Sequence, residues 1–251
     1  MVRSGLVPYG YARDAQRAIS RARADGELPD VLLLLEHPPT YTKGRRSSAD
    51  ELPMGEDWYR LQGIEVHETD RGGRVTYHGP GQLVGYPIVS LAELEARDDV
   101  HEYVRVMERA MTGALAEHGV AAGTIDGLTG VWTEGAHPSE ALLGSERKVA
   151  RKIGSIGVHV SRGVTTHGFA VNVANDLQPF EWIVPCGIEA CRMTSLTREL
   201  GAEQEVGGFA GTIATHVARG YGRKPVDVHP ARLAELIEGT EPLAAATPAV
   251  A

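Results

Sequence analysis

A pair of strand-like segments in the middle of the chain limits the folds that this sequence can adopt. The segments are KIGSIGVHV, residues 152–160, and TTHGFAVNV, residues 165–173, with the short sequence SRG between them. A glycine-containing connection of this length between runs rich in β-branched residues is typical of a β-hairpin. The sequence therefore predicts two neighbouring strands joined by a tight turn.

Other strand-like runs lie outside this pair. Residues 31–42, VLLLLEHPPTYT, predict a buried strand that two consecutive prolines stop, because proline cannot donate to a strand ladder. Residues 64–91 predict a strand, a glycine-rich turn and a second strand, and residues 43–57 predict a polar loop. The remaining predicted strands are GVWTE, residues 130–134, and EWIVP, residues 181–185.

Helical spacing of apolar side chains occurs mainly towards the two ends of the chain and in one long insertion. Residues 99–118 carry the clearest pattern, and Gly119 ends it. The apolar stripe of this helix consists of Val100, Tyr103, Val104, Met107, Met111 and Leu115. Further helices are predicted over residues 11–25, 194–200 and 211–222. Strands grouped in the middle indicate an α+β fold rather than an alternating βαβ fold.

Composition restricts the class of protein further. The chain has 251 residues, of which 42% are hydrophobic and 23% are charged, as in an ordinary globular protein. The formal charge of −8 argues against broad nucleic-acid binding. Two cysteines make no disulfide framework, and we see neither a signal peptide nor a membrane-spanning run. We expect a cytoplasmic protein with one domain, residues 1–223, and a C-terminal extension, residues 224–251, that is at least partly disordered.

Cys186 is the first candidate for chemistry, because it lies between Pro185 and Gly187. The proline fixes the backbone before the thiol, and the glycine leaves room for a substrate carbonyl beside open backbone N–H groups. The alternative is a cysteine buried for packing, which is how we interpret Cys191. A nucleophilic role also requires a group that stabilises the thiolate, since a free thiol is mostly protonated at neutral pH.

Lys152 is the candidate for that group. It heads the uncharged run IGSIGV, and a cation close to a thiolate lowers the pKa of the thiol. The alternative is a lysine at a strand end whose ammonium group reaches solvent. Histidine is the more usual partner of a reactive cysteine, and the chain contains ten histidines.

The glycine-rich segment RGGRVTYHGPGQ, residues 71–82, is a second candidate for the site. Its glycines allow the backbone to approach another group closely, and the alternative is a tight β-turn. The polar side chains that would form a pocket wall are Arg71, Arg74, Tyr77, His78 and Gln82. The segment is neither GxGxxG nor a P-loop. His78 and His167 are single histidines outside any HxH or HExxH motif, so we predict no metal site.

Two basic clusters interrupt this acidic chain, at residues 42–46, TKGRR, and residues 146–152, ERKVARK. A run of charges is usually a solvated face of the protein. Both clusters nevertheless lie close to the candidate site in the order of the motifs. We therefore also consider the docking of an acidic partner protein.

Together these segments resemble the lipoyl(octanoyl) transferase family, the octanoyl-[acyl-carrier-protein]:protein transferases of lipoate synthesis. The resemblance rests on RGGRVTYHGPGQLVGYPI, RKIGSIGVHVSRGVTTHGFAVNV and NDLQPFEWIVPCGI in this order, and more weakly on EHPPTYTKGRR. It implies a fold like the catalytic domain of biotin and lipoate protein ligases, with a large mixed β-sheet, a smaller sheet and flanking helices. Residues 1–223 would then be a single octanoyltransferase catalytic domain.

The resemblance also implies roles for individual residues. The acyl-thioester cysteine of the family matches Cys186, and its lysine matches Lys152. The implied substrate-binding residues are Arg71, Gly72, Gly73, Arg74, Val75, Thr76, Tyr77, His78, Ser155, Ile156, Gly157, Gly168, Phe169 and Ala170.

The implied activity is acyl transfer, EC class 2.3.1, in the first step of protein lipoylation. An octanoyl group passes from octanoyl-acyl carrier protein to Cys186 and then to a lysine of an apo lipoyl domain. The implied acceptors are the lipoyl domains of 2-oxoacid dehydrogenases and the glycine cleavage H protein. No cofactor is implied, and we expect a monomer that binds neither nucleic acid nor membrane. After acylation, Lys152 would lose its negative partner and accept a proton from the attacking lysine.

Three other functions remain possible on this sequence. An ATP-dependent lipoate or biotin-type ligase would share the fold, but it has no need of a nucleophilic cysteine, so Pro-Cys-Gly argues against it. A non-catalytic module that binds acyl groups or carrier proteins would tolerate the loss of Cys186. A cysteine hydrolase would require water to reach the thioester.

Overall fold

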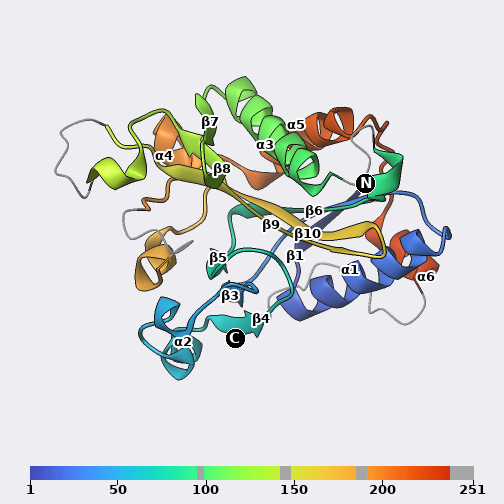
Figure 1. Ribbon diagram of the computed structural model, residues 1–251, viewed down its shortest axis with the longest axis horizontal. Helices are drawn as coiled ribbons and strands as arrows, with labels where there is room; N and C mark the ends of the chain where they lie inside the picture. Colours follow the sequence, from blue (N-terminus) through green and yellow to red (C-terminus); the bar gives the residue numbers. More distant parts are fainter. Residues whose placement is uncertain (95–98, 142–147, 185–190, 238–251) are drawn as a thin grey trace.

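The computed structural model describes residues 1–94, 99–141, 148–184 and 191–237, and in this part of the chain two β-sheets are packed with helices (Figure 1). The larger sheet has the strand order β1 (Val2–Leu6), β2 (Val31–Glu36), β6 (Gln82–Ile88), β10 (Val164–Asn172), β9 (Lys152–Ser161), β8 (Leu128–Thr133) and β7 (Ala122–Ile125). The smaller sheet has the order β4 (Glu65–Glu68), β3 (Thr40–Lys43) and β5 (Thr76–His78).

Both sheets are mixed, because each contains one parallel pair. β1 runs parallel to β2, and β3 runs parallel to β4, whereas the other neighbouring strands are antiparallel. The predicted α+β class, with a large mixed sheet and a smaller one, is confirmed.

The predicted hairpin at the centre of the larger sheet is confirmed as β9 and β10. The two strands pair in antiparallel register, with Gly157 opposite Gly168. Arg162 and Gly163 at the turn have φ values of 52° and 74°. Positive φ at both central residues gives a turn whose twist matches that of the flanking strands. Glycine meets this requirement without steric cost, which explains its place in the SRG turn.

Helices cover both faces of the larger sheet. α3 (Val100–Glu117) and α5 (Val206–Gly220) lie on one face, and α1 (Tyr9–Ala24) lies on the other with α6 (Pro230–Leu236) (Figure 1). Side chains alternate along β10, since Phe169 and Val171 belong to the core under α3 and α5, whereas Ala170 belongs to the core under α1. The remaining helical segments are α2 (Glu56–Leu61), α4 (Leu196–Leu200) and the 3₁₀ turns η1 (Ala49–Glu51), η2 (Leu91–Glu93), η3 (Pro138–Ala141) and η4 (Gln178–Trp182).

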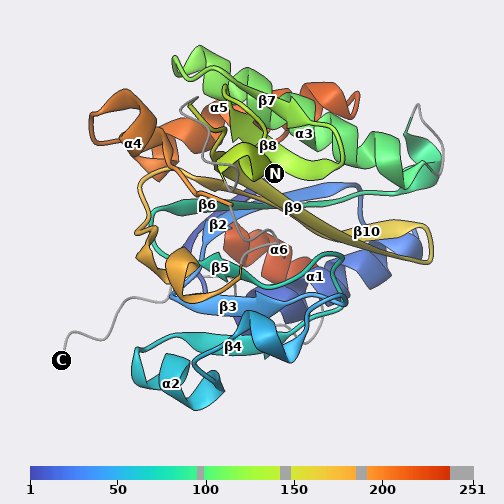
Figure 2. The same cartoon turned by 60° about the vertical axis from the view of Figure 1, so that its left-hand side comes forward.

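The smaller sheet forms a separate layer beside α1, with α2 at its outer edge (Figure 2). Its own apolar cluster contains Tyr41, Tyr59, Tyr77 and Phe180. The rings of Tyr41 and Tyr59 meet edge to face at 4.9 Å between centroids. This aromatic cluster holds the layer together and joins it to the segment that precedes residue 185.

The predicted strand EWIVP is wrong. Glu181 and Trp182 end the 3₁₀ turn η4, and Pro185 lies outside the described residues. Pro179 lies at the start of this turn, where its missing N–H costs nothing, and the Asp176 carboxylate accepts from the amide of Gln178 at 2.9 Å. Turn chemistry upstream therefore decides the conformation of this segment.

Two further predictions concern the loop over residues 43–57 and the C-terminal boundary of the domain. The predicted loop over residues 43–57 contains the turn η1 and the start of α2. The expected domain boundary after residue 223 stays a prediction. Leu233, beyond that boundary, is buried in the core under α1, and α6 packs against β1.

Candidate active site

A cavity of about 490 Å³ lies along β9 and β10, between the glycine-rich loop that follows β4 and the first turn of α3. Fourteen of the site residues that the sequence predicted line it: Arg71, Gly72, Gly73, Arg74, Val75, Thr76, His78, Lys152, Ser155, Ile156, Gly157, Gly168, Phe169 and Ala170. Cys186 lies outside the described residues. Tyr77 does not line the cavity, because neighbouring side chains of a strand point to opposite faces.

Bare glycines bring the loop of residues 71–73 against the hairpin. The amide of Gly72 donates to the carbonyl oxygen of Val158 at 2.9 Å. A Cβ atom on Gly157 would lie 3.0 Å from both Arg71 Cδ and the carbonyl oxygen of Gly72. A Cβ atom on Gly168 would lie 2.3 Å from the carbonyl oxygen of Gly85. The cavity wall at this point is therefore built from backbone, which only glycine permits.

Arg71 braces the loop rather than presenting its charge to solvent. The residue is buried, and its guanidinium donates to the carbonyl oxygen of Thr42 at 2.6 Å, to Thr42 Oγ1 and to the carbonyl oxygen of Gly72. Its donors are therefore directed at the smaller sheet and its own loop. In this arrangement the arginine fixes the shape of the cavity wall.

His78 connects the cavity to a buried polar network. Its Nδ1–H donates to Gln82 Oε1 at 2.8 Å, and burial lowers the pKa of His78 to about 3, so the ring is neutral. Gln82 Nε2 donates to Asn172 Oδ1, and Asn172 Nδ2 donates to the carbonyl oxygen of Thr194. The amide of Thr194 donates to the carbonyl oxygen of Lys152 at 2.9 Å. The network therefore fixes the backbone of the candidate lysine.

Lys152 is buried at the first residue of β9. Its amide donates to the carbonyl oxygen of Arg192 at 2.8 Å, and the residue forms a parallel bridge with Met193. Its Nζ atom lies 5.2 Å from the centroid of the Trp132 ring. Because a buried ammonium group needs compensating interactions, this position is unusual for a lysine and typical of a functional one.

Comparison with known proteins shows which family the chain resembles. The family described as the lipoyl protein ligase A/B catalytic domain matches residues 8–218. The chain belongs to this family. It is 44% identical over 226 residues to an octanoyltransferase from Nocardia farcinica, covering 90% of this chain and 83% of the relative. It is 46% identical over 213 residues to an octanoyltransferase from Mycobacterium leprae, covering 85% of this chain and 83% of that relative.

A solved structure supports the same assignment at the level of the fold. The chain superposes with a TM-score of 0.65 on a bipartite lipoate protein ligase from Thermoplasma acidophilum, at 15% identity and covering 95% of this chain and 93% of that one. The predicted resemblance to the lipoyl(octanoyl) transferase family and to the ligase fold is thus confirmed.

Several residues of this family member line the cavity without having been predicted to do so. They are Tyr9, Arg46, Val84, Tyr86, Val100, His101, Val104, Gly127, Leu128, Thr129, Val158 and His167. Val100 and Val104 belong to the predicted apolar stripe of α3, and the stripe does not reveal which residues face a cavity. Val158 and His167 adjoin the predicted residues Gly157 and Gly168, and the others come from segments that only the fold brings to the cavity.

Glu51 is a further residue that the sequence did not indicate. It is 2% exposed although it lies in a segment predicted as a polar loop. Its carboxylate pairs with Arg74 and accepts from the amide of Val75, and its carbonyl oxygen accepts from the amide of Val184 at 3.2 Å. One residue thus ties the glycine-rich loop to the segment that leads towards Cys186.

Only some side chains of the two basic clusters are exposed in the structure. Arg45 and Arg46 are exposed, whereas Lys43 pairs with Glu56 and Glu68. In the second cluster, residues 146–147 lie outside the described residues, and Lys148 is exposed. Arg151 pairs with Glu199, and Lys152 is buried. These last two side chains therefore do not form a solvated basic face.

The part of the chain that the structure describes contains neither a cluster of metal ligands nor a membrane-spanning helix. No group of three or more His, Cys, Asp or Glu side chains there is arranged to hold a metal ion. None of the helices in those ranges is both long enough and apolar enough to cross a membrane.

Proposed function

We propose that this chain is an octanoyltransferase of protein lipoylation and that it carries the acyl group as a thioester on Cys186. Curated relatives that are 44–46% identical over most of the chain are octanoyltransferases. The observation that carries the proposal is the single cavity in which buried Lys152 meets the glycine-rich loop and the β9–β10 hairpin. An apolar cavity suits an acyl chain, and a buried ammonium group suits a thiolate.

In the first step, the Cys186 thiolate attacks the carbonyl carbon of the octanoyl thioester on the acyl carrier protein. The bond between that carbon and the carrier sulfur breaks, and the carrier leaves as a thiolate that takes up a proton from solvent. A thioester on Cys186 remains. Lys152 stabilises the attacking thiolate by its charge.

In the second step, the neutral ε-amine of a lipoyl-domain lysine attacks the same carbon. The bond between carbon and the Cys186 sulfur breaks, an amide forms, and the thiolate is regenerated. The amine must lose one proton. Lys152, which no longer faces a thiolate at this stage, first releases its own proton to solvent, and we assign to the resulting neutral amine the acceptance of the proton from the attacking lysine. The incoming thioester is already activated, so the reaction proceeds without ATP.

The walls of the cavity favour an octanoyl chain over a short acyl group. Apolar side chains from five elements line it, namely Val84, Val104, Leu128, Ile156 and Phe169. Each buried CH₂ group contributes about 0.8 kcal/mol to binding. A chain of eight carbons is therefore expected to bind several kcal/mol more tightly than an acetyl group.

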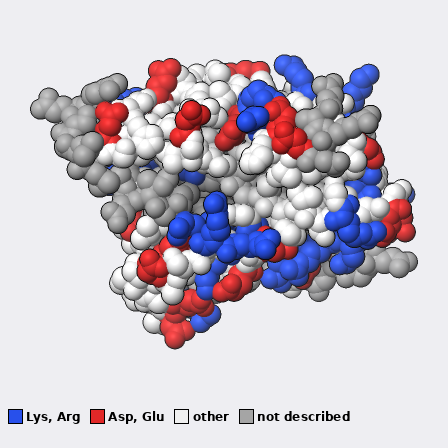
Figure 3. All heavy atoms as spheres, viewed as in Figure 1, with Lys and Arg blue, Asp and Glu red and all other residues white. Residues whose placement is uncertain are grey.

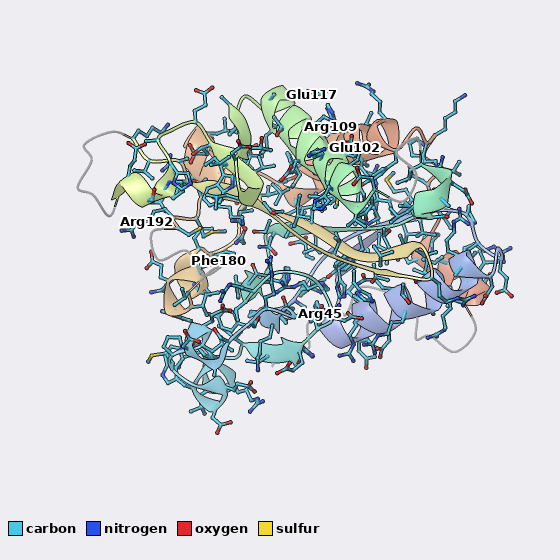
Figure 4. All side chains as sticks on the ribbon, in the orientation of Figure 1. Arg45, Glu102, Arg109, Glu117, Phe180 and Arg192 are labelled. Atoms are coloured by element: carbon cyan, nitrogen blue, oxygen red, sulfur yellow. The ribbon has the colours of Figure 1, made fainter. Side chains whose placement is uncertain are left out.

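Docking of an acidic acyl carrier is assigned to the exposed arginines beside the cavity. Lys and Arg side chains form a band across the middle of one face (Figure 3), in the region where Arg45 projects (Figure 4). Arg46 lines the cavity itself. Opposite charges on the carrier would raise the rate of encounter and orient it towards the cavity. We propose lipoyl domains of 2-oxoacid dehydrogenases and the glycine cleavage H protein as acceptors, and a cytoplasmic monomer as the working form.

The test is intact-protein mass spectrometry after incubation with octanoyl-acyl carrier protein and no ATP. The wild type should gain one octanoyl group that hydroxylamine removes and that an apo lipoyl domain discharges. Cys186→Ser should gain no hydroxylamine-labile group. Cys191→Ser is the matched control and should behave as the wild type, because Cys191 contacts Met193 at 3.9 Å and not the cavity.

Three results would contradict the proposal. Acylation of the lipoyl domain only with ATP and free octanoate would identify a ligase. Carrier binding that survives Cys186→Ser, with no adduct on the wild type, would identify a binding module. Release of free octanoate in the absence of acceptor, at the rate of adduct formation, would indicate a hydrolase.

A further inference from the structure

Trp132 and Lys152 lie opposite each other on neighbouring strands. They pair in the register between β8 and β9, after an irregularity that separates Val131 from Trp132. The Lys152 Nζ atom lies 5.2 Å from the centroid of the indole, within the range of a cation–π interaction. Trp132 is 1% exposed and Lys152 is 4% exposed, so water screens this contact very little.

Gly130 provides the space for the lysine side chain. A Cβ atom on Gly130 would lie 2.8 Å from Lys152 Cε and 3.3 Å from Lys152 Nζ, and the residue has a φ of +116°. Its amide donates to Glu108 Oε1 at 3.0 Å, which ties this part of β8 to α3. The strand is therefore shaped so that the ammonium group can lie beside the indole ring.

The indole ring is not held in place by a hydrogen bond. Its buried Nε1–H has no acceptor among the residues that the structure describes. A buried tryptophan usually finds such a partner, and an unpaired buried donor destabilises the fold. A phenylalanine would fill most of this position without that cost. The face of the indole, which binds cations better than the face of phenylalanine, is the feature that distinguishes tryptophan here.

We propose that Trp132 is a positioning residue for the reaction: its ring face holds the Lys152 ammonium group in a fixed position at the cavity wall. The ring attracts the charged form of the lysine, and the contact is desolvated on both sides. Loss of the ring would let the ammonium group move and hydrate, and the thiolate would lose part of its stabilisation. The inference rests on the proposed function, because it assumes that Lys152 supports Cys186.

The two steps of the reaction should depend on the ring to different degrees. The first step begins with a thiolate, whose population depends on where the ammonium group lies. The second step begins with a neutral thioester, so its rate does not depend on the fraction of thiolate that is present beforehand, although Lys152 still accepts a proton in this step. A merely structural tryptophan would affect both steps equally, through the fraction of folded protein.

The experiment compares Trp132→Phe and Trp132→Leu with the wild type by three measurements. These are the rate of Cys186 alkylation by iodoacetamide between pH 5 and pH 9, the single-turnover rate of acylation by octanoyl-acyl carrier protein, and the rate of discharge to an apo lipoyl domain. We expect Trp132→Leu to lower alkylation and acylation at pH 7 by roughly 3- to 30-fold, with recovery at higher pH. Trp132→Phe should lie between it and the wild type, and discharge should fall by a smaller factor than acylation.

Phe209→Leu is the matched control. Phe209, in α5, is fully buried in the hydrophobic core and does not line the cavity. It should lower the melting temperature and keep the wild-type pH profile. The inference is overturned if Trp132→Leu, or Trp132→Phe should the leucine variant not fold, keeps the wild-type pH profile. A wild type without an acyl adduct would instead contradict the proposed function, and the alkylation profile would still test Trp132.

Discussion

The Nε2 atom of His167 lies 2.7 Å from Asp70 Oδ1 at the wall of the cavity. His167 is buried in β10 with a φ of 58°, a conformation that residues other than glycine rarely adopt, and its amide donates to Gln16 Oε1 at 2.7 Å. Burial lowers the pKa of His167, and the hydrogen bond with His167 lowers the pKa of Asp70. At neutral pH the pair is therefore a carboxylate that accepts from a neutral imidazole.

This pair predicts different effects of two substitutions at position 70. Asp70→Ala leaves a buried N–H of His167 without its acceptor and should lower the free energy of unfolding by about 1–3 kcal/mol. Asp70→Asn keeps an oxygen that can accept the hydrogen bond from His167, so the free energy of unfolding should fall by less than about 1 kcal/mol. Urea unfolding at pH 7 measures both. Equal losses in the two variants would mean that the hydrogen bond does not hold His167.

Replacement of Lys152 by arginine separates the two roles assigned to it. Arginine keeps the positive charge but does not deprotonate, so it cannot accept a proton from the attacking lysine. We expect Lys152→Arg to retain measurable acylation and to slow discharge by about 100-fold or more. Lys152→Gln, the control without charge, should impair both steps. Full discharge activity of Lys152→Arg would show that another group accepts the proton.

A methyl group on Gly157 should disturb the cavity wall. The added Cβ atom would lie 3.0 Å from Arg71 Cδ and from the carbonyl oxygen of Gly72, so the glycine-rich loop must shift. Crowding of this kind typically costs about 1–3 kcal/mol, and we expect Gly157→Ala to lower the efficiency of acylation about tenfold. Gly123→Ala is the control, because a Cβ atom there meets nothing within 4 Å. Steady-state kinetics with the acyl carrier substrate tests both variants.

Acid should destabilise the protein through buried His37. Its Nδ1–H donates to the carbonyl oxygen of Val7 at 2.6 Å, its Nε2 accepts from the hydroxyl of Tyr86, and burial lowers its pKa from 6.5 to about 4. A histidine with a lowered pKa contributes stability above pH 6.5, and this contribution is lost as the pH falls towards 4. The loss for one such histidine is about 3 kcal/mol over this range.

His37→Gln removes the titrating group and should reduce the dependence of stability on pH between 6.5 and 4. Chemical unfolding at several pH values measures this dependence. His101→Gln, a change of an exposed histidine, should keep the slope of the wild type. An unchanged slope in His37→Gln would assign the acid sensitivity to other groups, of which buried His78 is the first to examine.

The parts of the fold that the sequence predicted correctly depend on local interactions. The SRG turn, the helix α3 and the apolar run of β2 each follow from the spacing of neighbouring residues, although Val100 of the predicted α3 stripe is exposed. The same reasoning gave a wrong prediction for the segment EWIVP. Its apolar residues fit a strand, but a proline and an aspartate upstream start a 3₁₀ turn. Phe180 and Trp182 then anchor this turn against the smaller sheet.

The sequence likewise indicated some features of the candidate site and not others. The resemblance to the transferase family implied that the glycine-rich loop, Lys152 and the β9–β10 segments belong to one site, whereas the residue patterns alone also allowed a tight turn and a lysine at a strand end. The sequence did not indicate that Thr76 and His78 face the cavity while Tyr77 faces the aromatic cluster. That choice follows from the alternation of side chains once the register of β5 against β3 is set.

By itself, the sequence determined the family, the α+β class and the candidate residues for thioester chemistry, since these depend on residue types and their order along the chain. The tertiary structure alone decided that Trp132 lies opposite Lys152, and that Glu51 joins the glycine-rich loop to the segment before residue 185. Both contacts join segments far apart along the chain. Their formation depends on strand register and burial, which no local pattern of residues encodes.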